Sequence, residues 1–172
     1  FNLTLNSAPQ GGAASAVWSG SSSGGGGMIL GNRSRLTVAT NQGYTGDTAI
    51  NSGAIMTLDY SGGGVNNIIP GNLRLIGGSV ILAGSSASSV VENVAVTRLG
   101  AGASSISALP GMAGRINLGS IARTLTTGTE AGSVLQIFGP SASTITENDA
   151  SLGMGILGAY VTYGAAGSIT TW

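Results

Sequence analysis

Six acidic side chains are the residues of this sequence that could act as catalysts or as ligands for a metal ion. Carboxylates serve as general acids and bases in glycoside cleavage and as oxygen ligands for calcium. The six are Asp47, Asp59, Glu92, Glu130, Glu147 and Asp149. Glu147 and Asp149 are the closest pair, and a Thr-Glu-Asn-Asp turn accounts for them without a metal. Asp47 and Asp59 could approach each other in the fold as a calcium or catalytic site, but a role in turns is favoured for both.

Histidine and cysteine are both absent from the sequence. Their absence argues against zinc, copper, haem and thiol chemistry and against a catalytic triad that uses an imidazole. We therefore expect no enzymatic activity, no cofactor and no metal. A chain without cysteine also fits an exported bacterial protein.

Charge is scarce, with six basic residues, all of them arginine, against six acids and a net charge of zero. Partners such as nucleic acid or an anionic membrane surface need a basic patch, so neither is expected. Disordered chains combine low hydrophobicity with high net charge, whereas 42% of this chain is hydrophobic. Gly, Ser or Thr interrupts every apolar run, so no segment is expected to insert into a membrane. The first residue, Phe1, is not methionine, which suggests a mature form or an excised segment.

Short segments with apolar residues at alternate positions recur along the chain and predict β-strands. Residues 1–6 follow this pattern, and a strand near Trp18 interrupts a Gly/Ser-rich run that ends in four glycines. The other predicted strands are 28–30, 36–40, 48–50, 55–59, 73–76, 79–83, 93–99, 104–107, 115–118, 133–138, 143–146, 159–163 and 168–170.

The strands are short, and glycines lie between them, whereas the hairpin dipeptides Asn-Gly and Asp-Gly are missing. This pattern favours parallel coils over hairpins. We therefore predict an all-β fold, a parallel β-helix or β-solenoid. Residues 1–27 are expected to form an N-terminal strand with a flexible segment, and residues 28–172 the solenoid domain.

One stretch carries a resemblance to a known family. The sequence LTVATNQGYTGDTAINSGAIMTLDY resembles the autotransporter-associated β-strand repeat of large exported bacterial proteins, through Tyr44, Thr45, Gly46, Ile50 and Gly53. Residues 70–172 more loosely resemble the segment that follows such repeats. The resemblance implies a right-handed parallel β-helix outside the cell, and it implies no catalytic residue.

Aromatic side chains could form a second kind of site, because sugars stack on them. The candidates are Trp18, Tyr44, Tyr60, Tyr160, Tyr163 and Trp172. No repeating ladder of aromatics is present, so packing at caps and corners is favoured for these residues.

The function predicted from these features is that of a secreted or surface-displayed structural protein that associates with copies of itself into a fibre, filament or adhesin stalk. The chain has too few charged residues to protect the ends of a solenoid from association. The candidate contact residues are Phe1, Leu3, Leu5 and Trp172. Two alternatives remain open. One is a polysaccharide-binding or polysaccharide-cleaving β-helix, as in a phage tail spike, with surface glycans as partners. The other is a passive autotransporter passenger segment.

Overall fold

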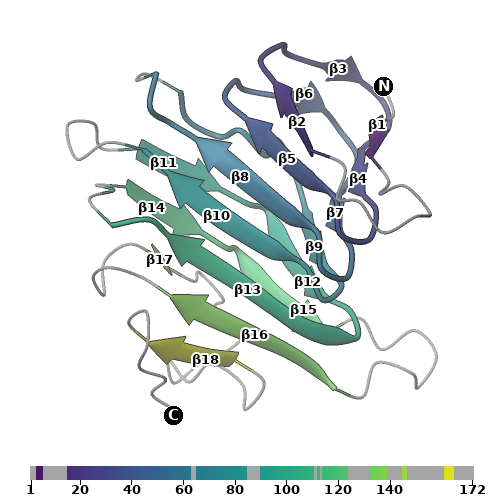
Figure 1. Cartoon of the computed structure of the whole chain (residues 1–172), viewed down its shortest axis with the longest axis vertical. Coiled ribbons are helices and arrows are strands. Elements are labelled where there is room, and N and C mark those ends of the chain that lie inside the picture. Colours follow the sequence, from purple (N-terminus) through teal and green to yellow (C-terminus); the bar gives the residue numbers. More distant parts are fainter. Residues whose placement is uncertain are drawn as a thin grey trace.

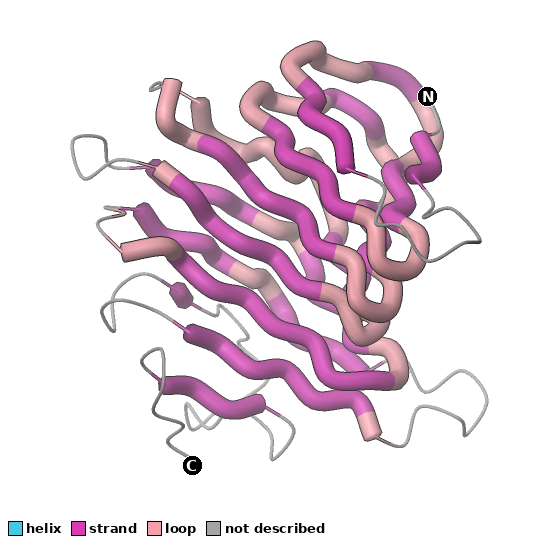
Figure 2. The backbone as a smooth tube through the Cα atoms, in the orientation of Figure 1, coloured by secondary structure: helices cyan, strands magenta, loops and turns pink. Residues whose placement is uncertain are grey.

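The chain folds into a stack of parallel strands, seen in a computed structural model. The structure describes residues 3–5, 15–62, 65–84, 90–110, 112, 114–123, 132–138, 145–146 and 161–164. These residues form strands and connecting loops without any helix (Figure 2). The described residues therefore contain no helix that could span a membrane. All the strand pairs are parallel, so the predicted β-solenoid is confirmed.

Two large sheets form the long sides of the solenoid (Figure 1). Sheet A has the strand order β1-β4-β7-β9-β12-β15, and its strands span Leu3–Leu5, Met28–Leu30, Thr48–Ile50, Leu73–Leu75, Val96–Leu99 and Ser120–Arg123. Sheet B has the order β2-β5-β8-β10-β13-β16-β18, with strands at Ser15–Trp18, Arg35–Val38, Ile55–Asp59, Ser79–Ala83, Gly102–Ala108, Ser133–Phe138 and Val161–Gly164.

A third side of the solenoid carries two smaller sheets. Sheet C pairs β3 (Ser23–Gly24) with β6 (Gly43–Tyr44). Sheet D has the order β11-β14-β17, with strands at Val90–Asn93, Gly114–Asn117 and Ile145–Thr146. One coil runs once through sheet A, sheet B and this third side. Between β8 and β9 the described residues, 60–62 and 65–72, pass the third side without a strand, at the level between sheets C and D.

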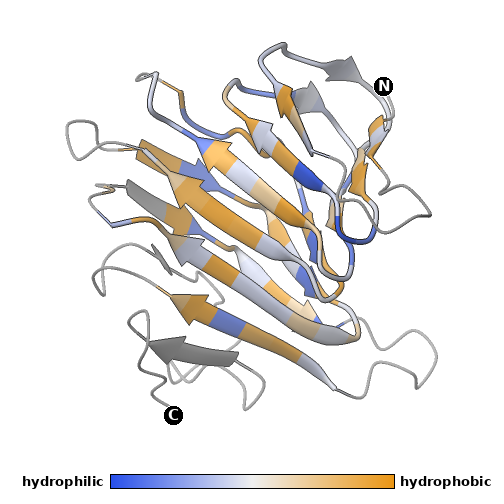
Figure 3. Cartoon of the chain, viewed as in Figure 1, coloured by the Kyte–Doolittle hydropathy of each residue, from blue (hydrophilic) through white to orange (hydrophobic). Residues whose placement is uncertain are grey.

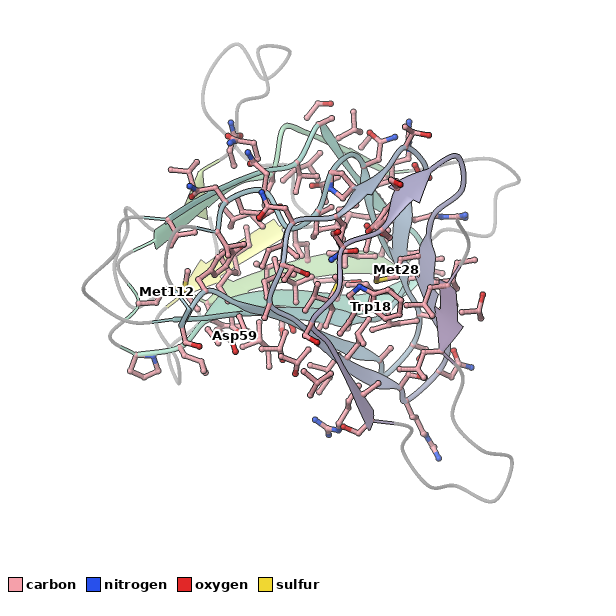
Figure 4. All side chains as sticks on the ribbon, turned by 90° about the horizontal axis from the view of Figure 1, so that it is seen from above. Trp18, Met28, Asp59 and Met112 are labelled. Atoms are coloured by element: carbon pink, nitrogen blue, oxygen red, sulfur yellow. The ribbon has the colours of Figure 1, made fainter. Side chains whose placement is uncertain are left out.

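The core follows from the alternation of apolar and polar residues. In β8 and β10 every second residue is buried. Figure 3 shows apolar residues along both strands. The register then stacks each buried residue on its equivalent one coil away, as Met56 stacks on Leu36 and Val80. Viewed along the stack in Figure 4, Trp18 and Met28 lie inside the ring of strands. Burial of these apolar columns holds the coils together.

Several strand predictions need correction. The strand predicted at 93–99 is two strands, β11 and β12, because the chain turns at Val94 and Ala95 between sheets D and A. Strands β3, β6 and β15 had no counterpart in the prediction. The strand predicted at 168–170 lies outside the described residues.

The N-terminal segment is continuous with the solenoid wherever the structure describes it. Strand β1 pairs with β4, β2 with β5, and β3 with β6. The Gly/Ser-rich run was expected to be flexible, but residues 15–27 form two strands and the turns beside them. Small side chains suit this segment because neighbouring coils approach closely: a Cβ on Gly27 would lie 2.3 Å from the carbonyl oxygen of Asp47.

Candidate functional site

The two aspartates considered as a pair lie on different sides of the solenoid. Asp47 precedes β7 of sheet A, where its Oδ1 accepts a hydrogen bond of 3.0 Å from the Asn72 amide and lies 3.6 Å from an Arg98 nitrogen. Asp59 ends β8 of sheet B, and its Oδ1 accepts a bond of 2.9 Å from the Ser61 backbone N–H. The structure therefore does not bring them together. Among the described residues, no group of three or more acidic side chains could hold a metal ion.

Among the described acids, Glu92 has the most unusual surroundings. It lies in β11 with its side chain fully buried among apolar residues. Three donors converge on its carboxylate: the Tyr60 hydroxyl at 2.7 Å and the Ile68 N–H at 2.7 Å on Oε2, and the Ile69 N–H at 2.8 Å on Oε1. A buried carboxyl group with this set of partners is satisfied within the protein.

The missing strand on the third side explains why a carboxylate is buried at position 92. Residues 60–62 and 65–72 form no strand at this level, so backbone N–H groups such as those of Ile68 and Ile69 have no ladder partner. Glu92 accepts two of these N–H groups, while the side-chain oxygens of Asn66 and Asn67 accept the N–H groups of Val91 and Asn93 at 2.8 and 2.9 Å. Side chains thus replace the missing ladder and join this loop to the next coil.

Burial raises the pKa of the Glu92 carboxyl from its ordinary value of 4.5 to about 7, although the bonds from Tyr60, Ile69 and Ile68 act in the opposite direction. Tyr60 itself stays protonated, because burial and the nearby Glu92 charge raise its pKa further above its ordinary value. Tyr44 is the other ionisable group that faces this region, and burial raises its pKa to about 12.

These values predict how stability depends on pH. Between pH 4.5 and about 7 the folded chain binds more protons at Glu92 than the unfolded chain does, so stability falls as pH rises through this window. The expected loss is on the order of 3 kcal/mol in the free energy of unfolding. Urea denaturation at pH 5, 6, 7 and 8 measures it.

The control for this pH dependence is Glu92→Gln, which removes the titrating group and keeps its shape. Its stability should vary much less than that of the wild type over the same range. An equal pH dependence in both proteins would assign the effect to another group.

Three of the aromatic candidates, Trp18, Tyr44 and Tyr60, pack against or within the core. Tyr44 and Tyr60 are each only 1% exposed, which leaves no ring face for a sugar. The Tyr44 hydroxyl is hydrogen bonded to Thr48, and Trp18 packs against the core at the N-terminal end. Packing is therefore confirmed for these three residues. Tyr160 and Trp172 lie outside the described residues, and Tyr163 lies in β18.

The motif residues span β6, β7 and the turns that follow these two strands. Tyr44 and Ile50 are buried, whereas Thr45 is exposed. Gly46 lies so close to the previous coil that a Cβ would be 2.3 Å from the Gly26 carbonyl oxygen. Gly53 has a φ of +69°, a left-handed conformation that glycine adopts without steric cost.

The N-terminal end of the solenoid consists of strands that have a strand partner on one side only among the described residues. Strands β1, β2 and β3 are the outermost strands of sheets A, B and C, and all three belong to the same coil, at the top of Figure 1. Leu3 and Leu5, two of the predicted contact residues, lie in β1 and are partly buried against the core. The other two, Phe1 and Trp172, lie outside the described residues.

Comparison of the chain with protein-family models, with curated proteins and with solved structures finds no match. The resemblance to the autotransporter-associated repeat therefore stays a prediction that rests on the motif residues. The fold itself is that of a β-solenoid, consistent with a structural repeat protein.

Proposed function

We propose that this chain is a structural β-solenoid, secreted or displayed on a cell surface, that associates with copies of itself through its N-terminal coil. The observation that carries the proposal is the set of open edges on β1, β2 and β3, which have no further strand partner among the described residues. Unpaired N–H and C=O groups along a strand edge pair readily with another chain.

The composition of this end favours a second copy as the partner. Proteins that stay monomeric protect strand edges with charged side chains, proline or bulges. Strands β1, β2 and β3 contain neither charge nor proline, and no charged residue occurs anywhere in residues 15–27. Stacking one solenoid on the end of another continues the parallel ladder and covers the apolar interior. Repeated head-to-tail contacts of this kind give a filament.

Lysines placed on the edge strand β2 test this association. Ser15 and Val17 point outward from β2, and Val17 is 74% exposed, so changing both to lysine leaves the core intact. The wild type is expected to form assemblies whose size grows with concentration. The variant Ser15→Lys/Val17→Lys should be monomeric in sedimentation experiments, because two charges on the edge oppose strand pairing.

The matched control carries two lysines on β5 and β8, the first and second strands inside the β2 edge of sheet B. Thr37 in β5 and Thr57 in β8 lie in register with Val17, and both face outward. Thr37→Lys/Thr57→Lys should assemble like the wild type. The proposal fails if the wild type is monomeric at high concentration, or if the two double variants behave alike.

A further inference from the structure

A groove lies along the outer face of sheet A, at its N-terminal end. It has a volume of about 550 Å³. Its floor includes the outward side chains of Ile29 and Ala49, which pair in register on β4 and β7. Gly27, Gly46 and Asp47, in the turns before these strands, line it as well, together with Arg74 of β9. The volume is within the range of small-molecule sites.

Two glycines, Gly27 and Gly46, form part of the groove wall. A Cβ on Gly27 would meet the Asp47 backbone at 2.3 Å, and a Cβ on Gly46 would meet the Gly26 backbone at the same distance. Glycine is therefore required for the close approach of successive coils here. Gly27 and Gly46 therefore contribute only backbone atoms to this wall, beside the side chain of Asp47.

The charged residues near the groove carry an excess of positive charge, with two arginines against one aspartate. Arg74 and Arg98 are direct neighbours on β9 and β12, about 4.8 Å apart across the sheet. Like charges in such positions repel each other. Asp47 neutralises only part of this charge, because its Oδ1 faces Arg98 and Asn72. Within the described part of the chain, the Arg74 side chain has no hydrogen bond or ion pair.

We propose that this groove binds an acidic sugar through its carboxylate. The Arg74 guanidinium has the planar fork that binds a carboxylate through two parallel hydrogen bonds. A bound anion also relieves the repulsion between Arg74 and Arg98. The second carboxylate oxygen of Asp47 accepts a sugar hydroxyl, and Ile29, which is 44% exposed, offers apolar contact to a ring face. Leu3 and Thr4 of the edge strand β1 also line the groove, so the site borders the surface of the proposed self-association.

Calorimetric titration with trigalacturonate tests the site, with neutral maltotriose and sodium acetate as comparison ligands. The wild type should bind trigalacturonate and neither of the others. Arg74→Gln should weaken binding about tenfold or more, because a charge-assisted bidentate contact is lost. Arg35→Gln is the matched control: it removes the same charge from an exposed position on sheet B, and it should leave the affinity unchanged.

A second variant blocks the groove without removing a charge. Ala49 points outward from an internal strand, so Ala49→Phe fills the groove floor and should abolish binding while the circular dichroism spectrum is unchanged. The proposal is overturned if trigalacturonate does not bind the wild type, if acetate or maltotriose binds equally well, or if Arg74→Gln and Arg35→Gln have the same affinity.

Discussion

Replacement of Glu92 by alanine is expected to lower the free energy of unfolding by about 4 kcal/mol. The reason is that three donors lose their acceptor at once: the Tyr60 hydroxyl and the Ile68 and Ile69 N–H groups, all in the interior. Each buried donor without a partner costs about 1 to 3 kcal/mol. Urea denaturation at pH 8, where the Glu92 carboxyl is ionised, measures the loss.

Two comparison variants show whether the loss at Glu92→Ala comes from its hydrogen bonds. Glu92→Gln keeps an oxygen for Tyr60 and Ile68 but turns an amide N–H toward Ile69, so it should cost less, about 1 to 2 kcal/mol. Asp59→Ala removes a partly exposed carboxylate with one local bond and should change stability by less than about 1 kcal/mol. If Glu92→Ala is no more destabilising than Asp59→Ala, the network of Glu92 does not join the two coils.

Replacement of Gly46 by alanine is the second change with a large expected effect, about 3 kcal/mol of lost stability. The added Cβ would lie 2.3 Å from the Gly26 oxygen and 2.6 Å from its carbonyl carbon. These are backbone atoms of the previous coil, and the Gly46 N–H donates a bond of 2.6 Å to the same oxygen. The contact can be relieved only by moving the coils apart. Thermal unfolding followed by circular dichroism measures the effect.

Gly25 provides the control for this substitution. It lies in the same glycine-rich turn region, but a Cβ there would meet no atom within 4 Å. Gly25→Ala should therefore be close to neutral or slightly stabilising, because alanine has less conformational freedom than glycine in the unfolded chain. Equal melting temperatures for the two variants would contradict the requirement for close contact at Gly46.

Strands with a clear period of two were the part of the fold that could be predicted. Residues 28–30, 48–50, 55–59, 79–83 and 133–138 are strands with the predicted bounds, because their apolar side chains alternate. The two-residue strands β3 and β6 are too short to show any period. The turn at Val94 and Ala95 contains no glycine or proline, so nothing in the sequence separates β11 from β12.

The surroundings of Glu92 were missed, although the sequence contains a signal for them. Val90 and Glu92 fall on the same face of a strand, and an acid at an inward position needs a buried partner. Its partners lie 23 to 32 residues earlier in the chain, in a loop without periodicity. The groove beside Arg74 was likewise beyond prediction, because it depends on the register that places β9 next to β12.

The parallel register has a mechanical consequence. Each strand pairs only with strands one coil away, at spacings such as 20 residues from Met28 to Thr48 and 25 from Thr48 to Leu73. Tension on the two ends of the chain therefore peels off an outer coil while the next one stays folded. Each step releases about 70 to 90 Å of extended chain. The bonds of Glu92 resist this peeling at one level of the stack, where they link residues 60–69 to the following coil.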